Sequence, residues 1–224
     1  MTLAKQDSLK TQIYNTIKKK ILDQTYQDGQ FLTERKLSAE MNVSRTPVRE
    51  ALQRLQKESW VQYVPYKGIF IKSLDATDLK HIFQIRSALE MLAVRLACSN
   101  ITSDQLQMLR LSLERQASET DGDTPDYRKF ILYDTEFHNI IISSAGNMML
   151  SSIIDEIRDK IKRTGINSLY SRRSRIAEAV AEHTAIVDAL ADKNAQAASA
   201  AMENHLHLCY TSAYGYIIRQ NIAH

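Results

Sequence analysis

The sequence predicts a mainly α-helical protein with two domains and one small β-hairpin. Its 224 residues are enough for two domains that each bury a core. Only 6 glycines and 3 prolines interrupt the chain, and such a composition is typical of helical proteins. Apolar residues recur at helical spacing in most segments, starting with a helix that Ser8 is expected to cap. Only residues 60–71 change to short β runs.

The stretch Thr33–Leu55 has the pattern of two short helices joined by a tight turn. Asn42 suits the turn because its short side chain tolerates a left-handed backbone. Ser44 is a good cap for the second helix, and Pro47 falls in that helix's first turn, where its missing N–H costs little. The apolar side of the pair would consist of Leu37, Met41, Val48, Leu52 and Leu55. The pattern predicts a helix-turn-helix.

Polar residues at the N-terminal end of the second helix would face outwards. They are Arg45, Thr46, Arg49 and Gln53. In a helix-turn-helix this end meets base edges in the major groove, where arginine can bind guanine through two hydrogen bonds. We therefore expect this end of the helix to contact DNA.

Two short β runs, Trp60–Val64 and Ile69–Ile71, flank a turn that contains proline and glycine. This arrangement indicates a hairpin, which would form a wing beside the two helices. Lys67 at the tip is a candidate for phosphate or minor-groove contact, and Gly68 would let the backbone approach closely. The two aromatic residues of the first run are expected in the core: Trp60 and Tyr63.

The run Val43–Leu52, preceded by Glu34–Leu37, resembles the winged-helix head of the GntR family of bacterial transcription regulators. The resemblance covers residues 8–72 and is specific, because ten consecutive positions agree in residue type. It departs from the family at Ser59, where glycine usually follows the recognition helix. The resemblance implies a winged helix-turn-helix that binds double-stranded DNA. The residues assigned to this contact are Arg35, Ser44, Arg45, Thr46, Arg49, Lys67 and Gly68.

Charge is distributed unevenly along the chain. Residues 1–72 carry 13 lysines and arginines against 7 aspartates and glutamates, whereas the remainder carries 16 against 19. A basic head on a slightly acidic body fits a polyanionic partner for the head alone.

Two further features predict the compartment. Cys98 and Cys209 lie far apart in apolar helical stretches, which indicates buried free thiols in a reducing environment. The first residues are polar, and no apolar run is long enough to cross a membrane. We therefore expect a cytoplasmic protein with no signal peptide and no membrane contact.

The short segment 73–77 predicts a boundary between a first domain, 1–72, and a second domain, 78–224. Beyond it every segment has a helical pattern, interrupted at Asp121–Pro125 and at Gly146–Asn147. The expected helices span residues 78–98, 103–119, 126–144, 148–163, 173–191 and 194–218. The second domain should be an all-α helical bundle.

Asp134 and His138 are four residues apart on one expected helix, so their side chains share a face that is otherwise apolar. Buried polar groups of this kind need a partner. His183 and His205 flank a turn, roughly 14 Å before it and roughly 18 Å after it, so an antiparallel helix pair brings them to one level. Such a set could bind Zn²⁺, Ni²⁺ or Mn²⁺, or each histidine could be an ordinary core residue.

The sequence around these residues is similar to the ligand-binding domain of the FadR-type branch of GntR regulators. The matching residues are Asp134 and His138, then Glu182, His183 and Ile186, then Met202, His205 and Leu206. In that branch a helical bundle often holds a metal through one aspartate and three histidines, beside a small carboxylate effector. The expected metal is zinc, which suits imidazole ligands, with nickel or manganese as alternatives. Its ligands would be Asp134, His138, His183 and His205.

Arg86 and Glu90 match another recurring pattern of that branch. Arg86 would clamp the effector carboxylate, since a guanidinium fork matches a carboxylate. Alternatively, Arg86 pairs with Glu90 one helical turn away. The sequence does not choose between these roles.

A group of basic residues follows in the second domain. They are Arg158, Lys160, Lys162, Arg163, Arg172, Arg173 and Arg175. We interpret them as a solvated basic face rather than as a source of one arginine for the effector pocket.

These features favour a bacterial transcription regulator that reads a palindromic operator as a homodimer. A small organic acid bound near the metal would control the regulator's affinity for DNA. Repression is expected because it is commoner than activation in the family that the sequence resembles. Two alternatives stay open. The second domain could be a metal-free effector and dimerisation domain, or the metal could serve a hydrolase, although no general base is evident near the ligands.

Overall fold

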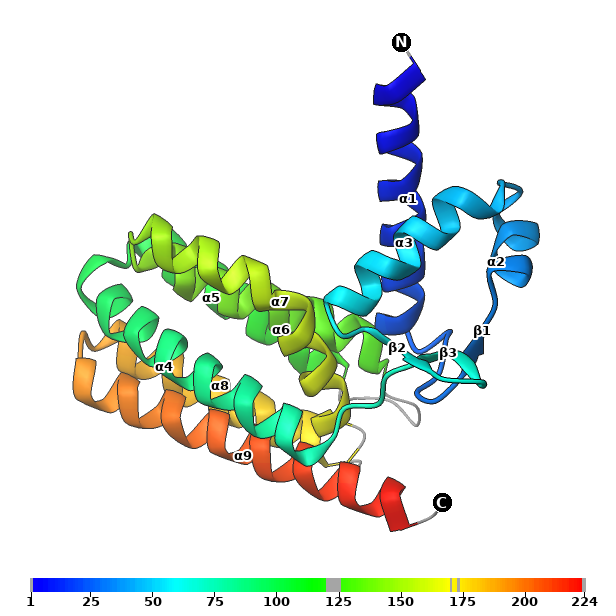
Figure 1. Cartoon of the computed structure of the whole chain (residues 1–224). Coiled ribbons are helices and arrows are strands. Elements are labelled where there is room, and N and C mark those ends of the chain that lie inside the picture. The colour runs from blue at the N-terminus through cyan, green and yellow to red at the C-terminus, as the bar shows by residue number, and fades with distance from the viewer. Residues whose placement is uncertain (1, 120–125, 170, 173, 223–224) are drawn as a thin grey trace. The chain divides into compact units, whose positions relative to one another are not determined.

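The computed structural model describes residues 2–119, 126–169, 171–172 and 174–222 (Figure 1). These residues form nine helices and three short strands, which confirms the prediction of a mainly α-helical protein with a small β element. The chain divides into two compact units, Met1–Leu74 and Asp75–His224. None of the helices within the described ranges is long and apolar enough to cross a membrane.

The first unit combines three helices with a three-stranded antiparallel sheet. Its elements are α1 Thr2–Leu22, β1 Phe31–Leu32, α2 Glu34–Met41, α3 Arg45–Lys57, β2 Val61–Val64 and β3 Gly68–Ile71. The strands lie in the order β1-β3-β2. β1 is not evident in the sequence, because two residues are too few to show an alternating pattern. The winged helix-turn-helix is confirmed.

The expected helix start at Ser8 is wrong, because α1 begins at Thr2. The residues before Ser8 include alanine, lysine and glutamine, which favour helices, and no glycine or proline stops the helix there. Further along, α1 buries Ile13, Ile17 and Ile21 at four-residue spacing. These side chains form the α1 part of the first unit's core.

The turn between α2 and α3 depends on Asn42, which has the expected left-handed backbone (φ 53°, ψ 48°). Its backbone N–H donates to the carbonyl of Ala39. Thr33 caps α2 by accepting a hydrogen bond from the backbone N–H of Lys36. The buried face of α3 consists of Pro47, Val48, Ala51, Leu52 and Leu55. This face packs against α1 and α2, so the opposite face of α3 is left to solvent.

The two aromatic residues expected in the core behave differently. Trp60 is 3% exposed, as predicted, whereas Tyr63 is 58% exposed and its prediction is wrong. Tyr63 lies on the same face of β2 as the buried Val61, but two residues nearer the turn. Its strand partner Ile69 packs partly against the core, but Tyr63 itself stays outside the core cluster.

The second unit is a bundle of six helices, which confirms the all-α prediction. They are α4 Ala76–Asn100, α5 Ser103–Ser118, α6 Tyr127–Ser144, α7 Met148–Leu169, α8 Arg175–Ala191 and α9 Ala195–Ile222. α9 packs against α4, α7 and α8, while α5 packs against α6 and α8 (Figure 1). The main core cluster draws on five of these helices, through residues such as Val94, Leu109, Phe137, Ile186 and Met202.

Three described helices of the second unit, α4, α7 and α9, are longer than predicted. α4 begins at Ala76, with Asp75 accepting a hydrogen bond from the backbone N–H of Asp78. α7 continues to Leu169, which places Gly165 inside a helix. Cys98 and Cys209 are both buried free thiols, as predicted.

Candidate functional site

The first candidate site is the N-terminal end of α3. Ser44, Arg45, Thr46 and Arg49 are exposed there, as is Arg35 on α2. The side chain of Ser44 makes no capping hydrogen bond, although its backbone occupies the cap position, so its hydroxyl can donate to a phosphate. The arrangement presents polar groups from a helix whose other face is held in the core. A helix needs this geometry to enter the major groove.

Arg49 is oriented by Glu34. Its Nε and Nη2 atoms donate to the two carboxylate oxygens at 2.8 and 2.9 Å, and these hydrogen bonds lower the pKa of Glu34. A two-point pair holds the plane of the guanidinium, but both side chains are accessible to solvent and the pair can open at low cost. Arg49 is therefore oriented by Glu34 and is still able to contact DNA.

The tip of the wing exposes Lys67 and also Tyr66, which is fully exposed. Tyr66 is not evident as a site residue in the sequence, where its signal is its place in the turn beside Lys67. Gly68 has φ +105°, and a Cβ atom there would lie 2.5 Å from Cε2 of Phe31. The turn itself therefore requires Gly68, independently of any contact with DNA.

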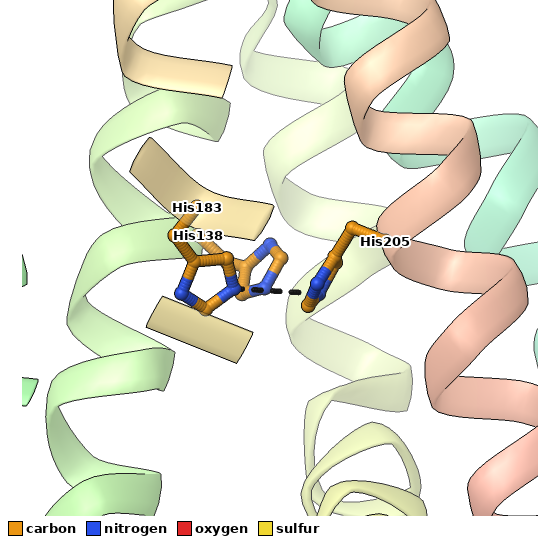
Figure 2. A group of neighbouring side chains, drawn as sticks. All are labelled: His138, His183 and His205. Carbon is orange, nitrogen blue, oxygen red and sulfur yellow. Dashed lines mark hydrogen bonds between the residues drawn. The ribbon is translucent and has the colours of Figure 1, made fainter. Parts of the chain in front are cut away.

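The second candidate site is a buried cluster of three histidines in the second unit. His138 comes from α6, His183 from α8 and His205 from α9, and their imidazoles face one another (Figure 2). The Nε2 atoms of His183 and His205 are 3.4 Å apart. Oδ1 of Asp134 lies 3.9 Å from Nε2 of His138 and 3.7 Å from Nε2 of His183. Packing thus brings together the four residues that the sequence singles out.

These spacings fit a metal ion. A tetrahedral zinc with Zn–N bonds of about 2.05 Å separates two nitrogen ligands by about 3.4 Å. The distance between His183 and His205 already has this value, and Oδ1 of Asp134 lies within 4 Å of Nε2 of both His138 and His183. Three imidazoles and one carboxylate are also a donor set that zinc accepts.

Each imidazole is held through its other ring nitrogen. An acceptor oxygen approaches Nδ1 in every case: Gln116 Oε1 for His183 at 2.7 Å, Glu182 Oε2 for His205 at 2.9 Å and Glu90 Oε2 for His138 at 2.6 Å. The last contact is close but is not aligned as a hydrogen bond. Acceptors at Nδ1 leave the Nε2 lone pair for a metal. The sequence does not identify Gln116, because its spacing on α5 resembles that of any polar surface residue.

Proton affinities differ within the cluster. Burial and the nearby His205 lower the pKa of His183 well below its ordinary value. Burial also opposes a charge on His205, but Cys209 and Glu182 outweigh it and raise the pKa of His205 to about 9. Although burial acts against it, the contact with His205 lowers the pKa of Cys209 to about 7. A metal at His205 would therefore displace a proton.

A second group of possible metal ligands, Glu182, His205 and Cys209, adjoins the first. Arg175 already neutralises it. Nη1 and Nη2 of Arg175 donate to the two carboxylate oxygens of Glu182 at 2.6 and 2.7 Å, and Nη2 lies 3.4 Å from Sγ of Cys209. A guanidinium in this place repels a cation, so the three-histidine group is the better metal candidate.

The interpretation of the basic group as a solvated face is wrong for Arg163 and Arg175, which are 3% and 0% exposed. α7 continues past its expected end and α8 begins at Arg175, so both arginines lie in helices and face inwards. The two-point ion pair with Glu182 compensates the burial of Arg175. Arg173 lies outside the described residues.

Arg86 forms the ion pair that is one of the two roles the sequence leaves open. Its Nε atom donates to Oε1 of Glu90 at 2.6 Å, so the expected ion pair is present. Although burial opposes it, Arg86 and His138 hold the pKa of Glu90 well below its usual range. The Nη2 atom lies 3.4 Å from Nε2 of His138, at the edge of the cluster. The pair with Glu90 therefore leaves part of the guanidinium facing the histidines.

A cavity of about 20 Å³ adjoins the cluster and is large enough for one water molecule. Its apolar walls include Phe130, Ile131 and Leu169. Its polar lining consists of Arg86, Asp134, Ser168, Arg175, His205 and Cys209. Two arginines and two of the candidate metal ligands thus meet in one small enclosed space.

Two known families match the chain. Residues 9–71 match the bacterial regulatory proteins of the GntR family, and residues 81–208 match the FCD domain. The chain belongs to the GntR family and carries an FCD domain. It is therefore a transcription regulator and not an enzyme, so the hydrolase alternative is wrong. FCD domains often bind a metal, and the three histidines form a possible ligand group in this one.

Similar proteins carry related names. The HTH-type transcriptional regulator YdhC of Bacillus subtilis is 30% identical, over 84% of this chain and 83% of its own length. The HTH-type transcriptional repressor RspR of Escherichia coli is 27% identical, over 87% of this chain and 84% of its own length. A GntR transcriptional regulator from Rhodococcus sp. RHA1 shares the fold, with a TM-score of 0.75 and 23% identity over 93% of this chain and 98% of the other.

Proposed function

We propose that this GntR-family regulator binds a palindromic operator as a homodimer, represses transcription in the cytoplasm and responds to a small organic acid. The observation that carries the DNA-binding half is the row of exposed polar side chains at the N-terminal end of α3. One recognition helix reads only a half-site, so a second copy supplies much of the specificity. The relative named as a repressor supports repression.

The proposed DNA contacts divide into two kinds. Arg45, Thr46 and Arg49 would meet base edges, with arginine and guanine as the most specific pairing. The remaining contacts would hold the phosphate backbone and set the register of the helix in the groove. They are Arg35, Ser44, Lys67 and Gly68.

We further propose that Asp134, His138, His183 and His205 hold a divalent metal ion, with zinc favoured over nickel and manganese. The spacing of the Nε2 atoms and the acceptor at each Nδ1 support this assignment. When bound, the metal supplies a positive charge that attracts a carboxylate. Arg86, which lines the adjoining cavity, would hold the same carboxylate through its guanidinium.

An effector can change DNA affinity only if it binds the DNA-bound and DNA-free forms of the dimer unequally. The proposed effector site lies among α4, α6, α8 and α9, so the effector would act on how the FCD domains hold the two heads. The DNA-binding half does not depend on this step and can be tested alone.

The test of DNA binding is selection of bound sequences from a random library by the full chain, followed by affinity measurements on the selected site. We expect a palindrome, and we expect Arg49→Ala to lose preference for it. Arg54→Ala is the matched control, because Arg54 lies on the same helix but stacks on Tyr14 and pairs with Glu58. Unchanged specificity in Arg49→Ala would show that α3 does not read the bases.

The test of the metal centre is elemental analysis of untagged protein purified without chelator. We expect about one zinc, nickel or manganese ion per chain, lost in His183→Ala and kept in His207→Ala, because His207 is exposed on α9. Absence of metal from the wild type, even after reloading, would favour a metal-free effector and dimerisation domain. That outcome would leave the DNA-binding half intact.

A further inference from the structure

The turn at the tip of the wing has a bulky residue where the backbone favours glycine. The backbone N–H of Lys67 donates to the carbonyl of Val64 at 3.0 Å, which closes a four-residue turn. Pro65 fixes a negative φ at the second position of this turn, and Tyr66 has φ 63° at the third. These signs are those of a type II turn, whose third position normally holds glycine or asparagine. The tyrosine therefore occupies a strained position.

Tyr66 differs from the other residues that share this backbone conformation. Among the described non-glycine residues, positive φ angles also occur at Gln24, Asn42, Ser59 and Lys193. Tyr66 is the only aromatic residue in this set, and a positive φ is a genuine outlier for a bulky side chain. Its side chain is fully exposed, so packing in the core does not offset the strain. Strained backbone of this kind is typical of functional sites, which indicates that the ring serves a partner.

The base of the wing supports this tip. β2 and β3 pair up to the turn itself, with Val64 opposite Gly68. The ring of Phe31 lies against Gly68, where a Cβ atom would approach Cε2 of the ring to 2.5 Å. The same ring packs on Phe70, with ring centroids 5.1 Å apart. β1 therefore braces the hairpin, and Tyr66 is presented on a paired and packed support.

An exposed tyrosine beside a lysine matches the chemistry of the minor groove of DNA. At A·T pairs the floor of this groove carries only hydrogen-bond acceptors, the N3 atom of adenine and the O2 atom of thymine. A G·C pair adds the N2 amino group of guanine, which is a donor and projects into the groove. The tyrosine ring is flat and apolar, and its hydroxyl can donate to the acceptors of an A·T pair. The neighbouring Lys67 suits a phosphate at the edge of the groove.

We propose that Tyr66 inserts into the minor groove beside each half-site and makes the regulator select A·T pairs there. This inference rests on the proposed function, in which α3 reads the half-site and Lys67 contacts a phosphate. It adds a sequence preference outside the bases that α3 reads. A tip used only for contact with another protein would give no such preference.

The test measures the affinity of the full chain for its selected operator after the base pairs beside each half-site are changed from A·T to G·C. We expect the wild type to lose about tenfold in affinity on this change, and to recover when inosine replaces guanine. Inosine lacks the N2 amino group but keeps the major-groove face of guanine, so recovery identifies a minor-groove contact. Tyr66→Gly should bind all three operators alike, at about the affinity of the wild type for the G·C form.

Tyr66→Gly should also make the first unit more stable, because glycine adopts a positive φ without strain. We expect its melting temperature to rise by about 2–6 °C. Ser59→Gly is the matched control, since Ser59 has the same φ of 63° but follows the C-terminal end of α3. That variant should gain similar stability and keep the preference for A·T pairs. A purely structural role of Tyr66 cannot combine a gain in stability with a loss of selectivity.

The possible failures have different meanings. A wild type without A·T preference, an unchanged preference in Tyr66→Gly, or an inosine operator that binds like the guanine one would overturn the inference and leave the reading by α3 intact. A lower melting temperature of Tyr66→Gly would show that the fold itself needs the tyrosine, which also overturns it. Failure of the wild type to select any palindrome would contradict the proposed function, and this inference with it.

Discussion

Each of the two units of this regulator contains a short arginine–carboxylate contact. In the DNA-binding unit Arg49 meets Glu34 at 2.8 Å, with side chains 60% and 27% exposed. In the FCD domain Arg86 meets Glu90 at 2.6 Å, with both side chains 3% exposed. The chemical groups are the same, and the surrounding medium differs.

Exposure to solvent determines whether each ion pair can open. An ion pair in water gains little, is screened by salt and can exchange one partner for another. Arg49 can therefore leave Glu34 for a base edge. A buried pair cannot open without exposing an uncompensated charge to a low dielectric, so Arg86 stays in place and a ligand must come to it. Under the proposed function, the first unit would recognise DNA by rearrangement of Arg49, whereas the second unit would recognise its effector through a preorganised Arg86.

Breaking the buried pair should have the largest effect. We expect Arg86→Ala to lower the free energy of unfolding of the second unit by about 3–5 kcal/mol, because Glu90 would be left buried without its guanidinium partner. Denaturant titration followed by circular dichroism would measure the change. Arg49→Ala should leave stability unchanged within error, and equal losses in the two variants would refute the contrast.

Removing the metal should have the next largest effect. A metal present at a hundred to a thousand times its dissociation constant stabilises the folded state by about 3–4 kcal/mol. Chelation should therefore lower the melting temperature of the second unit, as measured by scanning calorimetry, and leave the transition of the first unit unmoved. His183→Ala should abolish the response. A shift in both transitions would mean that the metal does not act through the histidine cluster.

The next prediction concerns Lys67 in the DNA-binding unit, which is proposed to contact a DNA phosphate. We expect Lys67→Ala to weaken operator and non-specific DNA equally, and to reduce the slope of log affinity against log salt by about 0.9, the value for one phosphate contact. Fluorescence anisotropy over a range of salt concentrations measures this slope. An unchanged slope would place the wing away from the DNA backbone.

The smallest expected effect concerns the end of α3. Ser59 has φ 63°, a left-handed conformation that favours glycine. Relief of this strain, less the entropy that glycine adds to the unfolded chain, should make Ser59→Gly more stable by about 0.5–1 kcal/mol. Thermal unfolding of the first unit would detect it. A loss of stability would show that the serine side chain contributes more than its backbone costs.

The head could be predicted almost completely because its determinants are local. Asn42 sets the turn and Ser44 and Pro47 begin the helix, all within one short stretch. Two features of this unit were predicted wrongly or missed, because a local sequence pattern does not contain enough information for them. Tyr63 follows the alternation of its strand but is exposed, and β1 is too short to show a pattern.

The histidine centre could be predicted in part. Asp134 and His138 share a helix face, and His183 and His205 are placed by the turn between α8 and α9, so each pair depends on a short range of sequence. The groups around them could not be predicted. Gln116 contacts His183 from α5, which is distant from α8 in the sequence. Arg175 belongs to a run of basic residues whose pattern is typical of a solvent-exposed face, although it pairs with Glu182 in the interior.

The sequence by itself determined the winged head and the helical body, because local residue patterns are enough for each, and its resemblance to a known family supplied the four candidate metal ligands. Only the tertiary structure decided which charges are buried, which acceptor orients each imidazole, and that Ser168 and Arg175 face one cavity. Burial and cavity shape arise from how several helices pack, and no single stretch of the chain contains that information.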